Sequence, residues 1–71
     1  MVKNRVKQIR EQKRITQIQM AKDLQITRQT VIAIEKNGYN PSLELALKIA
    51  AYFDMPVEKI FWLSSDKEGI R

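Results

Sequence analysis

The chain has 71 residues, 44% of them hydrophobic, and its 13 Lys and Arg exceed its 8 Asp and Glu to give a net charge of +5. This length predicts one small domain, and the positive charge is compatible with a nucleic-acid partner, although basic surfaces also serve solubility. The absence of Cys and His excludes disulfides and thiolate metal sites and removes the commonest acid-base catalyst. No stretch approaches the ~20 apolar residues of a membrane span, and the basic N-terminus lacks the apolar run of a secretory signal. We therefore expect a cytoplasmic protein.

Apolar residues recur at helical spacing along most of the chain, which predicts an all-α fold. The first helix is expected to begin near Asn4, with Val6 and Ile9 on its buried side. Arg10 lies beside this apolar stripe, where a long cation can be partly buried if a carboxylate pairs with it. Arg10 therefore needs an acidic partner elsewhere in the chain.

A capping pattern marks the start of a second helix. Thr16 and Gln19 have the T-x-x-Q spacing of a capping box, so this helix is expected to begin at Gln17 with its free amides and positive dipole end at the surface. Such an end attracts phosphate, although a cap of this kind is by itself more often only structural. The expected buried stripe consists of Ile18, Ala21 and Leu24.

The third helix combines an apolar face with an outer face of hydrogen-bonding side chains. Thr27 is a good N-cap, and Val31 and Ile34 are expected to point inward. The helical period then places five residues outward, namely Arg28, Gln29, Ile32, Ala33 and Lys36. Arg can bond two atoms of guanine, Gln two atoms of adenine, and an apolar side chain can contact a thymine methyl. Each residue taken singly is more often an ordinary solvated side chain, but the set together favours contacts with DNA bases.

The segment from Asn37 to Pro41 interrupts the helical pattern and predicts a loop. Ser42 is expected to cap a fourth helix, and Pro56 suits the first turn of a short fifth helix. The fourth helix is apolar over more than half its circumference and is expected to be the central packing element, through Leu43, Ala46, Leu47, Ile49, Ala50 and Phe53.

Three large apolar residues, Phe61, Trp62 and Leu63, follow one another near the end of the chain. They predict either a self-association surface or a lid over the core, and the pattern alone leaves both open. The domain is expected to span residues 1–63, and residues 64–71 form a polar C-terminal tail.

The stretches NRVKQIREQKRITQIQMAKDLQITRQTVIAIEKNGYNPSLELALKIAAYF and VEKIFWL make up most of the chain. They resemble the Cro/C1-type helix-turn-helix family, which contains small phage repressors and their bacterial relatives. The resemblance implies a compact five-helix bundle, with the second and third helices forming the helix-turn-helix, and it pairs Arg10 with Glu35. It also implies base contacts from Arg28, Gln29 and Ala33. Ile32 is added to these base-reading residues because the helical period places it on the same outward face. Contacts with the DNA backbone are expected from Thr16, Gln17, Thr27, Thr30, Lys36, Asn37, Tyr39 and Asn40.

Four positions depart from the family pattern. Gln25 stands where a turn glycine is usual, so a non-glycine residue must adopt a conformation that costs about 1 kcal/mol. Asp54 replaces another common glycine, and Pro56 replaces a common Ser cap. Ile32 occupies a position that is usually polar, which leaves the base preferred there open.

The leading functional hypothesis is a transcriptional repressor that binds an inverted-repeat operator in double-stranded DNA as a homodimer, with dimer contacts from Phe61, Trp62 and Leu63. The alternative is an antitoxin that neutralises a toxin and represses its own promoter, although antitoxins usually carry an additional toxin-wrapping segment. An enzyme is not expected, because neither a glycine-rich phosphate loop nor a metal-ligand cluster appears. We expect no metal, cofactor, small-molecule ligand or membrane partner.

Overall fold

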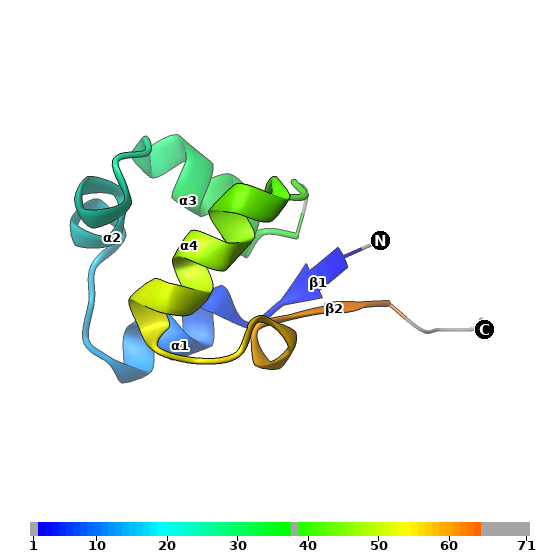
Figure 1. Ribbon diagram of the computed structural model, residues 1–71. Coiled ribbons are helices and arrows are strands. Elements are labelled where there is room, and N and C mark those ends of the chain that lie inside the picture. The colour runs from blue at the N-terminus through cyan, green and yellow to red at the C-terminus, as the bar shows by residue number, and fades with distance from the viewer. Residues whose placement is uncertain (1, 38, 65–71) are drawn as a thin grey trace.

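The computed structural model describes residues 2–37 and 39–64, and within these ranges the chain forms four α-helices, one 3₁₀ turn and a two-stranded sheet (Figure 1). In chain order the elements are β1 (Val2–Asn4), α1 (Val6–Gln12), α2 (Gln17–Leu24), α3 (Arg28–Glu35), α4 (Leu43–Phe53), the 3₁₀ turn η1 (Val57–Lys59) and β2 (Phe61–Leu63). The helices surround one core, and the sheet lies at one end of the molecule, where the N- and C-terminal parts of the chain meet (Figure 1).

The expectation of five helices in an all-α bundle was wrong. Residues Val57–Lys59 form only one 3₁₀ turn, and Phe61–Leu63 continue as a strand antiparallel to Val2–Asn4, with Lys3 opposite Trp62. The pairing extends beyond the sheet, since the Arg5 N–H donates to the Ile60 carbonyl at 3.0 Å. Strands of three residues are too short to produce a readable alternation, and each forms only because the other end of the chain supplies its partner.

The first helix begins at Val6, two residues later than expected, because Asn4 belongs to β1. The side-chain oxygen of Asn4 still accepts the N–H of Val6 at 2.9 Å and so satisfies one of the free amides at the start of α1. The three other cap predictions are confirmed. Thr16, Thr27 and Ser42 each accept a backbone N–H three residues further on, at 3.0, 3.1 and 3.1 Å.

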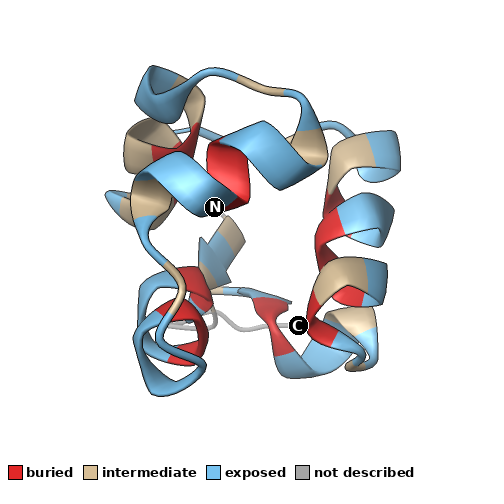
Figure 2. Cartoon of the chain, turned by 90° about the vertical axis from the view of Figure 1, so that its left-hand side faces the viewer, coloured by how far each residue is buried: buried red, intermediate tan, exposed pale blue. Residues whose placement is uncertain are grey.

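The buried residues face one another between the helices (Figure 2). The hydrophobic core consists of Val6, Ile9, Met20, Ala21, Val31, Ile34, Ala46, Ile49, Ala50, Phe53, Ile60 and Phe61. The expected inner faces of α1 and α3 are confirmed. In α2, Ala21 is buried and Leu24 packs against the core as predicted, but Ile18 is 60% exposed and Met20 is fully buried instead. In α4, Leu43 and Leu47 lie on the surface, so the apolar circumference of this helix is only partly used by the core.

The turn between α2 and α3 contains a residue in the left-handed region. Gln25 has φ 58° and ψ 42°, in agreement with the expectation drawn from its place in a glycine position. Asp54, at the end of α4, has nearly the same conformation, with φ 56° and ψ 48°. Each costs about 1 kcal/mol relative to glycine, which the fold offsets by burying its core.

Candidate nucleic-acid interface

The third helix is held from one side only. Val31 and Ile34 are fully buried, and the turn before α3 is fixed by the bond from the Ile26 N–H to the Ala21 carbonyl at 2.9 Å. The opposite face is therefore open to solvent, as the sequence predicted. Arg28, Gln29 and Lys36 are exposed on it, and Ile32 and Ala33 are half-buried.

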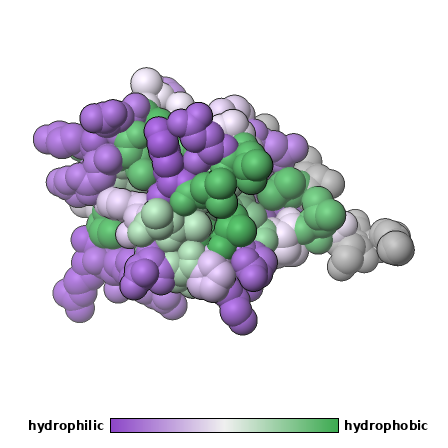
Figure 3. Space-filling view, in the orientation of Figure 1, coloured by the Kyte–Doolittle hydropathy of each residue, from purple (hydrophilic) through white to green (hydrophobic). Residues whose placement is uncertain are grey.

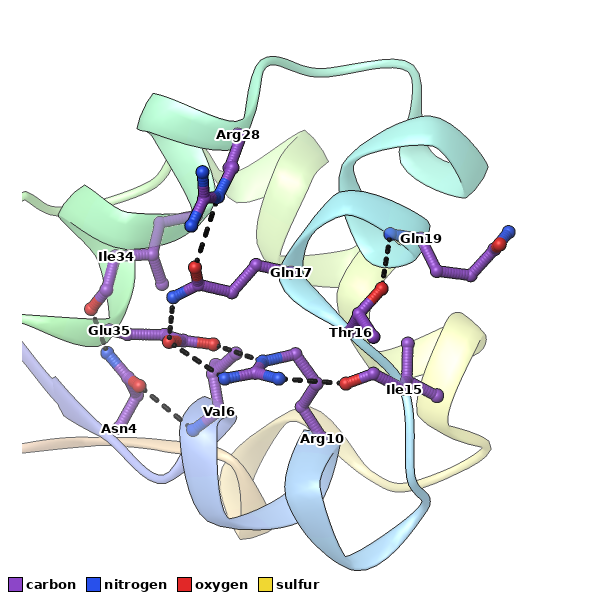
Figure 4. Close-up of polar contacts among 10 residues, drawn as sticks. All are labelled: Asn4, Val6, Arg10, Ile15, Thr16, Gln17, Gln19, Arg28, Ile34 and Glu35. Carbon is purple, nitrogen blue, oxygen red and sulfur yellow. Dashed lines mark hydrogen bonds and ion pairs between the residues drawn. The ribbon is translucent and has the colours of Figure 1, made fainter.

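Behind α3 lies a buried ion pair between Arg10 of α1 and Glu35 at the end of α3 (Figure 4). The Nε of Arg10 donates to Oε2 of Glu35 at 2.6 Å and its Nη2 to Oε1 at 3.3 Å, while Nη1 donates to the Ile15 carbonyl at 2.8 Å. Only 9% and 5% of the two side chains are exposed, so the attraction is little screened by water. The pair and the Ile15 contact together tie α3 to α1 and to the segment before α2.

Gln17, the first residue of α2, connects this ion pair to Arg28 (Figure 4). Its Nε2 donates to Oε1 of Glu35 at 3.1 Å, and its Oε1 accepts from Nε of Arg28 at 3.3 Å. The carboxylate can only accept and the guanidinium can only donate, so the two neighbours determine which way the amide points. Arg28 uses Nε for this bond, and no hydrogen bond of its two terminal amino groups to residues 2–37 or 39–64 is seen, so these groups can bind another partner.

The start of α2 has the features of an anion-binding helix end. The side chain and carbonyl of Thr16 satisfy the N–H groups of Gln19 and Met20, and the amides of Gln17 and Ile18 precede the first intrahelical bond. A hollow of about 290 Å³ lies here, bordered by Arg10, Thr16, Gln17, Ile18 and Arg28. The Gln17 side chain, which the sequence assigned to phosphate, makes both of its contacts inside the protein, so the backbone amides and Arg28 are the groups that face this hollow.

Asn37, expected on the DNA backbone, points its side-chain oxygen into the protein. This oxygen accepts from the N–H of Asn4 at 3.1 Å and from Nδ2 of Asn4 at 3.2 Å, and Nδ2 of Asn4 also donates to the Ile34 carbonyl at 2.9 Å. Asn4 thereby joins β1 to the end of α3 and to the following loop. The sequence did not predict this role, because a single polar residue near the N-terminus gives no sign of its partners. Beyond the loop's undescribed residue 38, Tyr39 and Asn40 are exposed.

The hydroxyls of the three candidate threonines are also used locally. Thr16 and Thr27 cap their helices, and the oxygens of Thr27 and Thr30 lie 2.9 Å apart in a mutual hydrogen bond. A hydroxyl has one proton and two acceptor positions, so these groups can still contact a phosphate oxygen after a rotation. The structure thus brings Thr27 and Thr30 together at the start of α3, next to Arg28.

A hydrogen bond on the other side of the motif joins α2 to α4. The Tyr52 hydroxyl donates to Oδ2 of Asp23 at 2.6 Å, and Nε2 of Gln19 donates to Oδ1 of the same carboxylate at 2.7 Å. Burial, together with the hydrogen bond and negative charge of Asp23, raises the pKa of Tyr52 from 10.0 to about 12. Tyr52 therefore remains a neutral donor through the physiological range and holds α2 against the helix behind it.

The apolar residues assigned to self-association are divided between the interior and the surface. Phe61 is a core residue, so the expectation that it lies on an exposed surface was wrong, whereas Trp62 and Leu63 are 40% and 73% exposed. Leu43 and Leu47 of α4 are also exposed. Hydrophobic side chains gather over α4 and the sheet in Figure 3, around a groove of about 430 Å³. We call the exposed residues Leu43, Leu47, Trp62 and Leu63 the α4–β2 patch.

The described residues offer no other obvious chemistry. Among residues 2–37 and 39–64, no group of three His, Cys, Asp or Glu is placed to hold a metal ion. In the same ranges, no helix has the length and apolar character needed to cross a membrane.

Two capped helices joined by a tight turn, with the second exposed along one face, define a helix-turn-helix domain. A family model described as helix-turn-helix matches residues 6–60, which is most of the chain. The chain belongs to this family, the Cro/C1-type helix-turn-helix proteins, as the sequence resemblance indicated. The family consists of non-enzymatic transcriptional regulators.

Relatives support the same assignment. An uncharacterized HTH-type transcriptional regulator of Methanocaldococcus jannaschii is 47% identical over 66 residues, which covers 93% of this chain and 100% of that protein. Another, from Bacillus subtilis, is 46% identical over 65 residues, covering 92% of this chain and 98% of the relative. A crystal structure of a Bacteroides fragilis protein, thought to bind DNA, superposes with a TM-score of 0.79 over 87% of this chain and all of that one. At 22% identity this last likeness supports the fold alone.

Proposed function

We propose that the protein is a repressor that binds an inverted repeat in double-stranded DNA as a homodimer. The observation that carries the proposal is the outer face of α3, where Arg28 and Gln29 project into solvent while the opposite face is locked into the core. A helix exposed in this way fits the major groove, whose base edges carry a distinct pattern of donors, acceptors and methyl groups. Occupation of a promoter by such a domain blocks access to it, and repression is the direct consequence.

Within this proposal the base contacts are divided among four residues. The free amino groups of Arg28 suit O6 and N7 of guanine, and the amide of Gln29 suits N6 and N7 of adenine. Ile32 meets a thymine methyl, and the small Ala33 allows the helix to approach closely. Gln17 acts through Arg28, because its bond to Nε limits the directions in which the guanidinium can point.

Contacts with the sugar-phosphate backbone supply most of the affinity and set the orientation of the domain. The hollow at the start of α2 is suited to one phosphate, since free amides, the helix dipole and Arg28 all favour negative charge there. Lys36 is exposed just after α3, and Tyr39 and Asn40 lie beyond it. The full set proposed for the backbone is Thr16, Gln17, Thr27, Thr30, Lys36, Asn37, Tyr39 and Asn40. Gln17 would act through its backbone amide and Asn37 through its side-chain amino group, because the Asn37 N–H already donates to the Ile34 carbonyl at 3.0 Å.

The α4–β2 patch is the proposed dimer surface. Three of its four large apolar side chains, Leu43, Trp62 and Leu63, line one groove, and together with the exposed Leu47 they are more apolar surface than a small monomer ordinarily leaves in water. A dimer that binds the two halves of an inverted repeat needs its recognition helices about 34 Å apart, one turn of the DNA duplex.

The test of base contact begins with selection of bound sequences from random duplexes, for which a palindromic consensus is expected. On that sequence, Gln29→Ala should weaken binding by about 1–3 kcal/mol, or about 5- to 150-fold, with little loss on unrelated DNA. Gln12→Ala, which removes an exposed glutamine from α1, is the matched control and should leave both affinities unchanged. Equal losses on both kinds of DNA for Gln29→Ala would exclude its role in sequence choice.

The dimer is tested separately by equilibrium sedimentation. Leu63→Ser should shift the wild-type dimer toward monomer, whereas Ile18→Ser, which changes an isoleucine that is 60% exposed at the start of α2, should not. A wild type that stays monomeric at micromolar concentration, alone and on DNA, would refute the dimer. A monomer that nevertheless needs the α4–β2 patch for repression would point instead to a different protein partner.

A further inference from the structure

A cleft of about 700 Å³ runs along the side of α1 that faces away from α3. Its floor is apolar and is formed by Ile9, Met55 and the ring of Trp62. Its rim is polar, with the amides of Gln8 and Gln12 and a cation at each end. This volume is within the range of small-molecule sites in proteins. The proposed DNA contacts use none of these residues, and only Trp62 is shared with the α4–β2 patch.

The two cations of the cleft, Arg5 and Lys13, are not neutralised by the part of the chain that the structure describes. Within residues 2–37 and 39–64, the ion pairs are Arg10 with Glu35 and Lys48 with Glu44, so neither rim cation has a carboxylate partner there. They are eight residues apart on or beside α1, about 12 Å along a helix axis. Positive charge at both ends of an apolar groove favours an anion with a nonpolar body.

The position of Arg5 adds a preference for a flat molecule. Its guanidinium carbon lies 5.1 Å from the centre of the Trp62 ring, a cation–π arrangement that leaves a planar, weakly hydrated cation at the cleft wall. An aromatic ring can stack on the guanidinium or lie against Trp62 and Met55, while its anionic group pairs with Lys13. The glutamine amides between the two cations can donate to the same anion.

The cleft is directly connected to the recognition helix through one residue. Arg5 follows Asn4, which bonds both the Ile34 carbonyl and the side chain of Asn37, at the end of α3 and in the loop after it. Trp62 lies in the strand paired with the one that contains Asn4. A ligand held between Arg5 and Trp62 would therefore contact one residue next to Asn4 and one in the strand paired with it.

We propose that this cleft binds a small planar organic anion, such as an aromatic carboxylate, and that its occupation changes the affinity of α3 for DNA through Asn4. The regulatory half of this proposal rests on the proposed DNA-binding function, while the binding half does not. It assigns to the domain a means of responding to a metabolite without a separate sensory domain.

Trp62 is the only tryptophan of the chain, so its indole N–H gives a single, assigned NMR signal. Titration with 2-naphthoate should shift this signal in a saturable way, and the neutral 2-naphthamide should bind much more weakly. Arg5→Gln and Lys13→Gln should each weaken naphthoate binding by about fivefold or more. Lys22→Gln removes one exposed charge outside the cleft and should have no such effect, and thermal unfolding of every variant checks that the fold is kept.

The second part of the test measures the affinity of the protein for its operator with and without saturating naphthoate. A change in affinity for the wild type that disappears in Asn4→Ala supports the coupling, and no change in the wild type overturns it. The proposed site is refuted if naphthoate does not shift the indole signal of the wild type, or if naphthamide shifts it equally. It is also refuted if Arg5→Gln and Lys13→Gln bind naphthoate no more weakly than Lys22→Gln does. Failure of the wild type to bind any operator would instead count against the proposed function. The indole titration would still test whether the cleft binds naphthoate, because that measurement contains no DNA.

Discussion

Replacing Arg10 by methionine tests how much the fold depends on the buried ion pair. Among the described residues, the change would leave the Glu35 carboxylate, 5% exposed, with the Gln17 amide alone as a partner, and it would remove the Arg10 donor of the Ile15 carbonyl. Removing one member of a buried pair typically costs 3–5 kcal/mol, because the remaining charge stays desolvated. A domain of this size has a stability of only about 4–10 kcal/mol, so Arg10→Met should lose a large part of the free energy of unfolding.

Urea denaturation followed by circular dichroism measures this loss, and the surface pair of α4 supplies the control. Lys48 and Glu44 lie 3.4 Å apart with 56% and 79% of their side chains exposed, so Lys48→Met should cost less than about 0.5 kcal/mol. The double variant Arg10→Met with Glu35→Leu should recover most of the lost stability, since no unpaired charge remains. If Arg10→Met lowers the free energy of unfolding by less than about 1 kcal/mol, or if the double variant is no more stable than Arg10→Met alone, the stability does not depend on pairing a desolvated Glu35 charge.

Three further predictions concern the scaffold. Gln25→Gly should raise the free energy of unfolding by up to about 1 kcal/mol, because glycine adopts the observed φ of 58° without strain; a loss measured in urea would contradict this. Ser42→Ala should lower the unfolding free energy by about 1 kcal/mol through loss of the cap on α4, and an unchanged midpoint would show that water replaces the hydroxyl. The raised pKa of Tyr52 means that its neutral form stabilises the fold, an effect fully present below pH 10 and lost as the pH rises toward 12. Absorbance titration of tyrosinate in the Tyr39→Phe variant, where Tyr52 is the only tyrosine, should give a midpoint near 12 that falls in Asp23→Asn.

The helical part of the fold could be predicted because its signals are local. Thr16, Thr27 and Ser42 identify three helix starts by their side-chain chemistry, and the spacing of Val31 and Ile34 orients the recognition helix. The sheet could not be predicted in this way. Its two strands are separated by nearly the whole chain, and whether Trp62 continues a helix or pairs with Lys3 depends on a contact that no short window contains.

The site shows the same division between local and long-range information. The outward face of α3 follows from the helical period, but the contacts of Gln17 depend on where three helices meet. A glutamine at a helix start is equally compatible with solvent, phosphate or a neighbouring side chain, and only the fold brings Glu35 and Arg28 to its two ends. Ile18 is an error of the local prediction, because Ile18 and Met20 both lie at helical spacing from the buried Ala21 or Leu24 and only the packing shows that Met20 is the buried one.

The pairing of β1 with β2 has a mechanical consequence. Val2 lies opposite Leu63 at the outer end of the sheet, and Asn4 lies opposite Phe61 next to the core. A force that separates residues 2 and 63 therefore opens the strand pair like a zipper, one pair at a time, before it reaches the helices. The last pair to open contains Asn4, so tension applied at the two ends of the domain would release the loop after α3 while the core was still folded.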